Sequence, residues 1–138
     1  SIDMGEAIDW QADVTNKLKD ADVVIFNPRR DDWDSSWKQD IDFQPFREQV
    51  EWEMEHLDKA DIIIYCFDPK GKAPITLLEL GLHAPREDQM IVVCCPEGFW
   101  RRGNVQIVCK KHNIPMVPDV DGIVTKVNQF LKHKVANG

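Results

Sequence analysis

One glutamate of this chain stands in a position suited to chemistry. Glu79 follows a short, apolar and β-branched run at 62–67, which predicts a buried strand, and a loop at 68–72 that contains a proline and a glycine. Its own surroundings at 74–81 are mostly apolar. A carboxylate just inside a helix, at the carboxyl end of a parallel strand, lies where open α/β sheets bind their ligands. There it can act as a nucleophile or as a base.

A structural role for Glu79 is the alternative. Thr76 and Glu79 have the spacing of a helix capping box. Pro74, however, suits the first helical position, and a helix that begins there places Glu79 beyond the first turn, where it cannot cap. The sequence leaves both interpretations open.

Other acidic residues could act together with Glu79. Glu51 and Glu53 lie in a predicted helix at 46–57, and Asp3 lies in the opening loop. Glycosyl transfer needs a carboxylate nucleophile to trap an oxocarbenium-like sugar and a second acid or polar group to protonate the leaving group. Here the leaving group would be a nitrogen of a base. The plain alternative for the helix is a solvated acidic surface.

Two further segments have the composition of binding loops. Residues 27–30, Asn-Pro-Arg-Arg, follow a predicted buried strand at 23–26 and could hold a ligand at its carboxyl end, or form an Asn-Pro turn followed by surface arginines. Residues 31–45, rich in Asp and Trp, predict a long loop, and such loops are usually lids or binding loops. We expect 29–37 to close over the ligand.

The segment 100–104, Trp-Arg-Arg-Gly-Asn, could clamp a phosphate, stack a base or form a subunit contact. The histidines do not have metal-ligand spacing, so we expect no metal site. The four cysteines contain no CxxC pair and mostly lie in apolar runs, which predicts reduced core cysteines in a cytoplasmic protein.

Strands and helices alternate along the chain. The pattern predicts helices at 6–18, 46–57, 102–112 and 121–134, a helix around Glu79 that ends near His83, and strands at 23–26, 61–67, 90–95 and 116–117. Such alternation specifies an α/β fold with a parallel sheet and helices on both faces. Residues 1–5 look like the loop after a strand, so either a first strand is missing from the chain or this edge of the sheet is completed in another way.

Length and charge exclude several classes of protein. The 138 residues are enough for one domain, over 1–138, and 43% hydrophobic with 30% charged residues is ordinary for a globular protein. A net charge of −7 argues against nucleic acid or an anionic membrane as a partner. A small phosphorylated ligand stays possible, because it needs only a local positive cluster.

Five segments, taken in order, resemble the nucleoside 2-deoxyribosyltransferase-like family. They are 1–5 (Ser-Ile-Asp-Met-Gly), 27–30, 49–53 (Gln-Val-Glu-Trp-Glu), 60–61 (Ala-Asp) and 77–81 (Leu-Leu-Glu-Leu-Gly), and the resemblance runs from Ser1 to about Gly122. It implies a flavodoxin-like (Rossmann-like) fold and movement of 2-deoxyribose between purine or pyrimidine bases.

The resemblance also implies roles for single residues. Glu79 would attack the anomeric carbon, and Glu53 would hydrogen-bond the base and help it leave, since both have the family's spacing from Asp61. Asn104 falls near an asparagine that reaches a neighbouring subunit's sugar hydroxyl, which implies a homo-oligomer with an intersubunit site. The complete set of expected site residues is Glu79 and Glu53 as catalytic residues, with Ser1, Ile2, Asp3, Asn27, Pro28, Arg29, Arg30, Trp33, Gln49 and Asn104 as substrate-binding residues.

The chain also departs from the family pattern. Ala73 occupies the place of an aspartate that helps to hold the sugar, Glu53 replaces a more usual aspartate, and a tyrosine expected near the end of the first strand would precede Ser1. These departures leave room for hydrolysis, a nucleotide substrate or another glycoside.

We therefore expect an enzyme that cleaves or transfers at the N-glycosidic bond of 2′-deoxynucleosides through a covalent deoxyribosyl-glutamate intermediate, with no cofactor. Its partners would be a nucleoside or nucleotide and a free base. One alternative is a deoxynucleoside 5′-monophosphate N-glycosidase that uses Arg101 or Arg102 against the phosphate. Another is a non-catalytic nucleotide-binding or sensing module.

Overall fold

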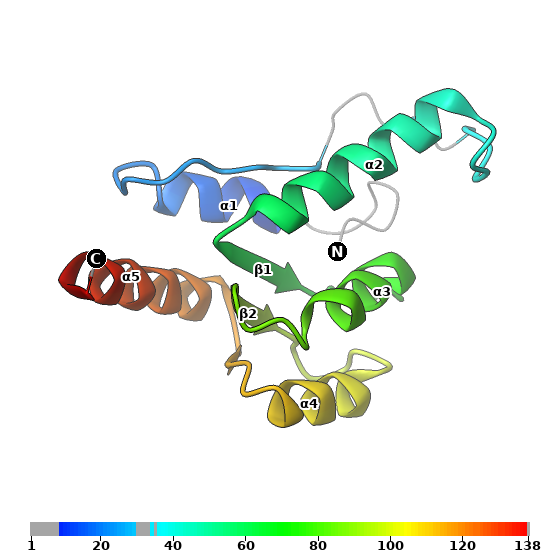
Figure 1. The fold of residues 1–138 in the computed structure, drawn as a ribbon. Coiled ribbons are helices and arrows are strands. Elements are labelled where there is room, and N and C mark those ends of the chain that lie inside the picture. Colours follow the sequence, from blue (N-terminus) through cyan, green and yellow to red (C-terminus); the bar gives the residue numbers. More distant parts are fainter. Residues whose placement is uncertain (1–8, 30–33, 35, 138) are drawn as a thin grey trace.

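The fold is a parallel sheet between two layers of helices (Figure 1). The computed structural model describes residues 9–29, 34 and 36–137, and the side chains of this range up to residue 134. Its elements are α1 (Trp10–Lys17), α2 (Gln44–Lys59), β1 (Ile62–Cys66), α3 (Pro74–His83), β2 (Met90–Cys94), α4 (Arg102–Lys111), β3 (Met116–Val117) and α5 (Val120–Asn137). Among the described residues, no helix has the length and apolar character needed to cross a membrane.

The sheet has the order β1-β2-β3, and both pairings are parallel. Ile62 lies opposite Met90 and Cys66 opposite Cys94. The Asp61 carbonyl accepts a hydrogen bond from the Met90 N–H (3.0 Å), and the Phe67 N–H donates to the Cys94 carbonyl (2.9 Å). Because backbone groups alternate in direction along a strand, the odd-numbered residues of β1 are the ones that bond to β2.

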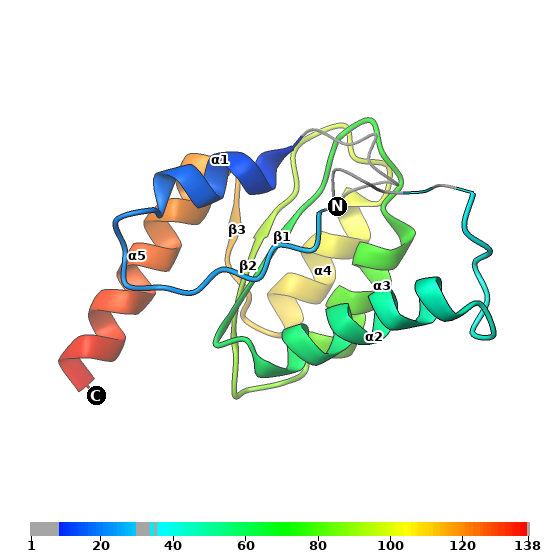
Figure 2. The same ribbon diagram turned by 90° about the horizontal axis from the view of Figure 1, so that it is seen from above.

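The two faces of the sheet carry separate halves of the core. Alternate residues Ile63, Tyr65 and Phe67 pack with Leu80 of α3 and Val105 of α4. Leu57, near the C-terminal end of α2, also packs against this cluster. The intervening residues pack with α1 and α5 on the other face, in a cluster that contains the buried side chains Val14, Leu18, Cys66, Val92, Cys94, Val117, Ile123 and Val127. Figure 2 shows the strands between these two helical layers.

The predicted α/β architecture is confirmed. The helices at 46–57, 102–112 and 121–134 and the strands at 61–67, 90–95 and 116–117 are present with ends shifted by a few residues. The first helix begins at Trp10, where the Asp9 side chain accepts from the Ala12 N–H (3.0 Å), so Asp9 is its N-cap rather than a helical residue. All four cysteines are buried and none of them forms a disulfide bond, as expected for core cysteines.

The predicted buried strand at 23–26 is wrong. This segment is extended but pairs with no strand of the described residues, and it is open to solvent: Val24 is 83% exposed and Phe26 45%. The prediction rested on β-branched composition, which indicates that a segment fits a sheet without supplying a neighbouring strand. The segment lies on the side of β1 away from β2 (Figure 1), and only Ala21 and Val23 join the core.

We predict that the exposure of Val24 is visible in the free energy of unfolding. Val24→Ala should change it by less than about 0.5 kcal/mol, because little apolar area leaves the core. Val92→Ala, the same change at a side chain with 0% exposure, should cost about 2 kcal/mol or more through lost burial and a cavity. Urea unfolding of both variants measures the difference, and similar costs at the two positions would contradict this placement of 23–26.

Candidate active site

Glu79 lies in the second turn of α3, past the reach of a helix cap. The helix begins with Pro74, its N-cap residue is Ala73, and no side chain caps it. The capping-box interpretation of Thr76 and Glu79 is therefore wrong, and Glu79 is left for another role. Ala73 has a left-handed backbone (φ 48°), which is uncommon for a residue with a side chain, and its methyl group is buried in the core.

Glu53 lies on α2 and is also half-buried. Its carboxylate Oε1 accepts a hydrogen bond from the Gln49 Nε2 one turn earlier, at 3.1 Å. Burial raises the pKa of Glu53, and the hydrogen bond from Gln49 partly opposes that rise. The predicted residues Glu53 and Gln49 therefore form one unit on the inner side of α2, unlike the exposed Glu51.

The two carboxyl groups interact across α2 and α3. Burial and, to a smaller extent, the negative charge of Glu53 together raise the pKa of Glu79 to about 7. Two half-buried carboxyl groups that repel each other cannot both ionise freely, so the pair tends to hold one proton near neutral pH. A site with one carboxylate and one carboxylic acid is what nucleophilic attack with acid assistance requires.

Tyr65 is a member of this site that the sequence analysis missed. It is the only tyrosine of the chain and lies buried on β1. Its hydroxyl has no hydrogen-bond partner among the described residues. Burial raises the pKa of Tyr65, and the negative charge of Glu79 raises it as well, so the phenol lies within reach of the charge of Glu79. A buried tyrosine hydroxyl usually has a hydrogen-bond partner. The signal available in the sequence was therefore a tyrosine within the predicted buried strand at 62–67.

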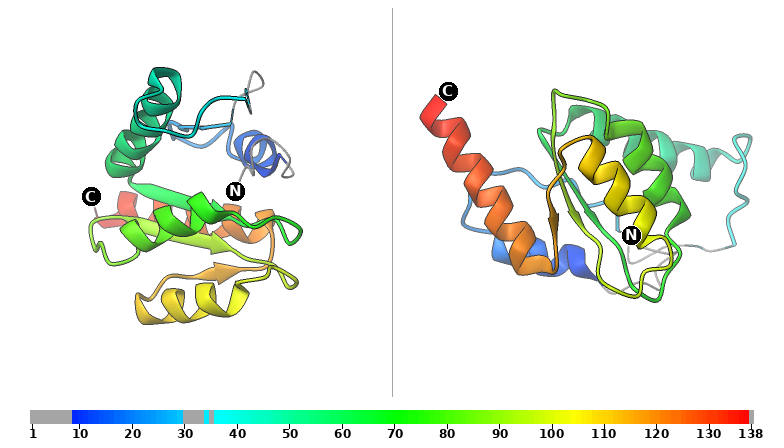
Figure 3. Two further views of the ribbon diagram at one scale, coloured as in Figure 1. Left: turned by 90° about the vertical axis from the view of Figure 1, so that its right-hand side faces the viewer. Right: turned by 90° about the horizontal axis from the view of Figure 1, so that it is seen from below.

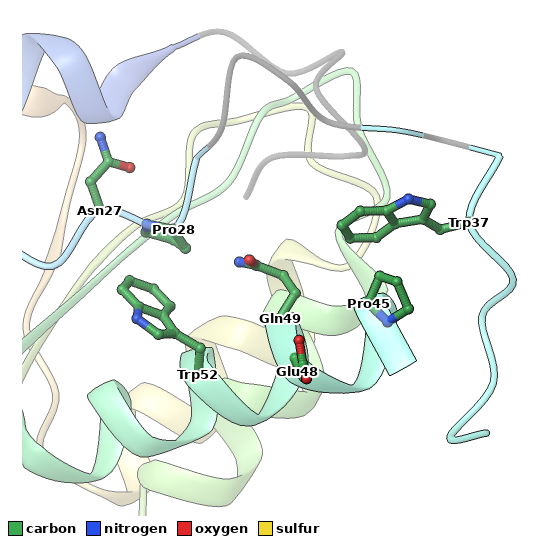
Figure 4. Close-up of a pocket in the computed structure, with 7 residues that line it drawn as sticks. All are labelled: Asn27, Pro28, Trp37, Pro45, Glu48, Gln49 and Trp52. Atoms are coloured by element: carbon green, nitrogen blue, oxygen red, sulfur yellow. The ribbon is translucent and has the colours of Figure 1, made fainter. Parts of the chain in front are cut away.

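A cavity of about 500 Å³ lies between α2 and the extended segment, and neither Glu53 nor Glu79 is among the residues that line it. Gln49 and Trp52 line it from α2, Asn27 and Pro28 from the extended segment, and Trp37 lies at one end (Figure 4). Its volume falls within the range of small-molecule sites, and its lining mixes aromatic rings with a few polar groups. Gln49 links the cavity to Glu53, because the same side chain lines the cavity and donates a hydrogen bond to Glu53.

A row of rings fastens the extended segment to α2. The Trp52 and His56 rings stack with centroids 4.0 Å apart, and Phe26 meets His56 edge-on at 4.6 Å. These contacts fix the residues just after Phe26, so that Asn27 and Pro28 come to the cavity. No spacing rule links residues so distant in sequence, and the sequence analysis therefore did not find His56 or Phe26.

Two interpretations were open for residues 27–30, a ligand-binding segment or a turn followed by surface arginines, and the structure shows features of both. The Asn27 Oδ1 accepts from the Arg29 N–H at 2.9 Å, which is the expected turn. Arg29 is not a surface arginine, because its side chain is only 15% exposed and its Nε lies 3.7 Å from the Asp9 carboxylate. Asn27 and Pro28 are at the cavity, so this stretch both turns the chain and lines the site.

The other expected residues lie elsewhere. Asn104 is exposed on α4 and is not among the residues that line the cavity. Arg102 is at a separate cavity of about 350 Å³, where its Nε donates to the Cys95 carbonyl (3.1 Å). Lys72 and Arg101 both stack on Trp100, at 4.8 and 4.4 Å from its ring centroid. The remaining expected residues, Ser1, Ile2, Asp3, Arg30 and Trp33, lie outside the described residues.

The described part of the chain contains no group of three or more His, Cys, Asp or Glu side chains that could hold a metal ion.

Residues 1–99 match the family described as nucleoside 2-deoxyribosyltransferase like, and the chain belongs to that family. The family places it among glycosyl-transferring enzymes that act on nucleosides. The match includes Glu53, Glu79 and every residue that lines the larger cavity, but it ends before Asn104 and short of the Gly122 limit expected from the sequence. No curated protein matches the chain.

We predict that Glu53→Gln lowers the pKa of Glu79 from its value of about 7, because the variant removes the neighbouring negative charge and leaves the burial of Glu79 in place. Carboxyl carbon NMR titration measures the midpoint directly. Glu51→Gln, an exposed change on the same helix, is the matched control for any effect on α2 itself. A Glu79 midpoint that does not fall in Glu53→Gln would show that the two acids do not face each other.

We predict that Tyr65→Phe leaves the free energy of unfolding unchanged or raises it by up to about 1 kcal/mol. The variant keeps the ring in the core and removes a hydroxyl that no described residue satisfies, so its desolvation cost disappears. Urea unfolding at pH 5, where Glu79 is mostly protonated, isolates this effect from the charge. A loss of 1 kcal/mol or more would mean that the hydroxyl has a partner in solution.

Proposed function

We propose that this protein cleaves the N-glycosidic bond of 2′-deoxynucleosides by double displacement, with Glu79 as nucleophile and Glu53 as acid and base. The observation that carries the proposal is the pair of half-buried acids from α2 and α3, one of which raises the pKa of the other. Gln49, which donates a hydrogen bond to Glu53, also lines a cavity of a size suited to a small molecule. Membership of the family supports the same class of substrate.

The location of the shared proton decides when the reaction can begin. In the free protein the proton favours Glu79, whose pKa is about 7. Attack on the sugar requires the opposite arrangement, with Glu79 ionised and Glu53 protonated. A base nitrogen that accepts a hydrogen bond from Glu53 stabilises the acid form of Glu53, and the proton then moves to that side of the pair. Binding of the correct base therefore activates the nucleophile.

In the first displacement an oxygen of the Glu79 carboxylate bonds to the anomeric carbon. The carbon–nitrogen bond breaks, its electron pair goes to the base nitrogen, and the Glu53 carboxyl group supplies the proton that neutralises the departing base. The product is a deoxyribosyl ester of Glu79 and a free base, with Glu53 now ionised.

In the second displacement a nitrogen of a new base attacks the same carbon, and the Glu79 carboxylate leaves. Glu53 takes the proton that the incoming base loses, which restores the starting state. Water in place of the base gives hydrolysis with the same proton transfer. Because each step inverts the anomeric centre, the product retains its configuration.

Tyr65 is a positioning residue in this proposal. Its buried hydroxyl has no hydrogen-bond partner among the described residues, and the charge of Glu79 raises its pKa, so in this proposal it donates to the carboxylate once Glu79 has lost its proton. Such a hydrogen bond stabilises the ionised form of Glu79 and orients one of its oxygens, leaving the other for attack. The ring itself is held by the core of the sheet.

We predict that Glu79→Gln lowers base exchange by at least about a thousandfold, because an amide cannot form the ester intermediate. Glu53→Gln should lower exchange by about a hundredfold to ten-thousandfold, the usual contribution of acid–base catalysis. Glu51→Gln, the exposed neighbour, should retain exchange within about twofold. Chromatography of a 2′-deoxynucleoside incubated with a different free base measures the new deoxynucleoside.

Two further readouts separate the roles of the acids. Mass spectrometry of rapidly quenched wild-type protein should show one added deoxyribosyl group, absent from Glu79→Gln. A substrate whose base leaves without protonation should restore turnover to Glu53→Gln but not to Glu79→Gln. Full exchange by Glu79→Gln would refute the mechanism, whereas release of base without exchange would keep the mechanism and make water the acceptor.

A further inference from the structure

The side-chain amide of Gln89 connects the C-terminal end of α2 to the sheet. Its Nε2 donates to the Leu57 carbonyl at 2.6 Å and to the Ala60 carbonyl at 2.8 Å. Leu57 is in the last turn of α2 and Ala60 is its C-cap, where carbonyl groups lack a partner within the helix. Gln89 directly precedes β2, so a residue at the start of a strand satisfies the open end of this helix.

The same amide also binds α3 through His83. Two carbonyl oxygens lie against one end of the Gln89 amide, so that end must be the NH2 group, and the Oε1 is left to accept. The His83 Nδ1 lies 2.9 Å from this Oε1, and it must therefore carry a proton and donate. The His83 side chain is buried in the fold, with 5% exposure of the residue. One glutamine thus holds the ends of two helices.

Arg86 makes a second, weaker connection between the same parts of the fold. Its guanidinium group lies 2.9 Å from the carboxylate of Asp58 on α2 and 2.9 Å from that of Asp88. The Asp58 side chain is 63% exposed, and ion pairs this open to water contribute little to stability. The half-buried amide of Gln89 is therefore the stronger constraint on the position of α2.

The position of α2 depends on such contacts because the helix is poorly buried. None of its 16 residues is fully buried, and Figure 3 shows it on the side of β1 away from β2. Leu57 packs against the core near its C-terminal end, next to the carbonyls that Gln89 binds. The contacts at this end therefore determine how α2 lies against α3.

The two helices that Gln89 joins are the helices that carry the acids. Glu53 precedes Leu57 by four residues on α2, and Glu79 precedes His83 by four residues on α3. Residues four apart lie on one face of a helix, separated by about 6 Å along its axis. Each acid is therefore about one turn away from the connection. A shift of α2 at Leu57 would carry Glu53 with it.

We propose that Gln89 and His83 are positioning residues of the active site, which set the separation of Glu53 and Glu79 by holding α2 against α3. The inference rests on the proposed function for the roles of the two acids, whereas the connection rests on the hydrogen bonds of Gln89. Neither Gln89 nor His83 lines the larger cavity, so their effect is indirect. The separation can be measured, because the charge of Glu53 contributes to the pKa of Glu79 of about 7.

The first test is carboxyl carbon NMR titration of Glu79 in matched variants. Gln89→Met keeps the length of the side chain and removes both donors, and His83→Leu removes the donor to Gln89. Both should lower the Glu79 midpoint toward that of Glu53→Gln, because a displaced α2 takes the charge of Glu53 away. His83→Asn keeps an N–H close to the place of Nδ1 and should retain the wild-type midpoint. If Gln89→Met does not fold, His83→Leu and His83→Asn make the same comparison with Gln89 in place.

A double-variant cycle shows whether the effect passes through Glu53. Added to Glu53→Gln, the change Gln89→Met should lower the Glu79 midpoint by less than it does in the wild-type protein, because no charge remains at position 53 to move away. Val127→Ala is the control for lost stability. It removes buried packing on the other face of the sheet, far from the Gln89 hydrogen bonds, and should leave the midpoint unchanged.

Base exchange is the second test. Gln89→Met and His83→Leu should lower kcat by about tenfold to a hundredfold with a smaller change in KM, since the acids are misplaced while the residues that line the cavity remain. His83→Asn and Val127→Ala should keep kcat within about twofold, at a temperature where both variants are folded.

Two results would overturn the proposal. One is a wild-type Glu79 midpoint in both Gln89→Met and His83→Leu, which would mean that α2 keeps its place without these hydrogen bonds. The other is an equal fall of the midpoint with and without the charge of Glu53, which would mean that the variants act by exposing Glu79. The titration needs no substrate. A lowered midpoint in a protein that shows no exchange or base release would therefore support the positioning role and refute the proposed reaction.

Discussion

The parallel pairing of β1 with β2 is the constraint on which the structure depends. It joins Ile62–Cys66 to Met90–Cys94 in a single register, and both faces of the pair are buried. A strand buried on both faces needs a helical layer on each side, which fixes α3 and α4 on one face and α1 and α5 on the other. The same register brings the carboxyl ends of both strands to one edge, where α3 begins.

The acids of the site work against folding at neutral pH. The pKa of Glu79 rises from a reference of 4.5 to about 7, so the folded chain binds its proton more tightly than the unfolded chain does. Between these two values the folded state binds more protons, and stability falls as the pH rises through that range. The cost at neutral pH is on the order of 2 kcal/mol, which the packing around β1 must offset. A carboxyl group retained at such a cost is more consistent with a chemical role than with a structural one.

The sequence predicted those parts of the fold that each segment specifies by itself. The strands at 62–66 and 90–94 were predictable because they are apolar on both faces, and Pro74 correctly predicted the start of α3. The prediction of a strand at 23–26 was wrong because a strand needs a neighbouring strand to pair with as well as a β-branched composition. Glu79 was singled out by its position after a predicted strand, and its pairing with Glu53 came from the family resemblance. Tyr65, His56 and Phe26 depend on tertiary contacts between distant segments.

The interaction of the two acids depends on how the sheet holds α2 and α3. Leu80 follows Glu79 on α3 and is buried against β1, and Leu57 packs on the same cluster one helical turn after Glu53 on α2. Both acids therefore come from helices that one half of the core anchors. Burial is the largest cause of the raised pKa of both Glu53 and Glu79. The packing of α2 and α3 on the sheet thus determines how the two acids share a proton as well as how stable the fold is.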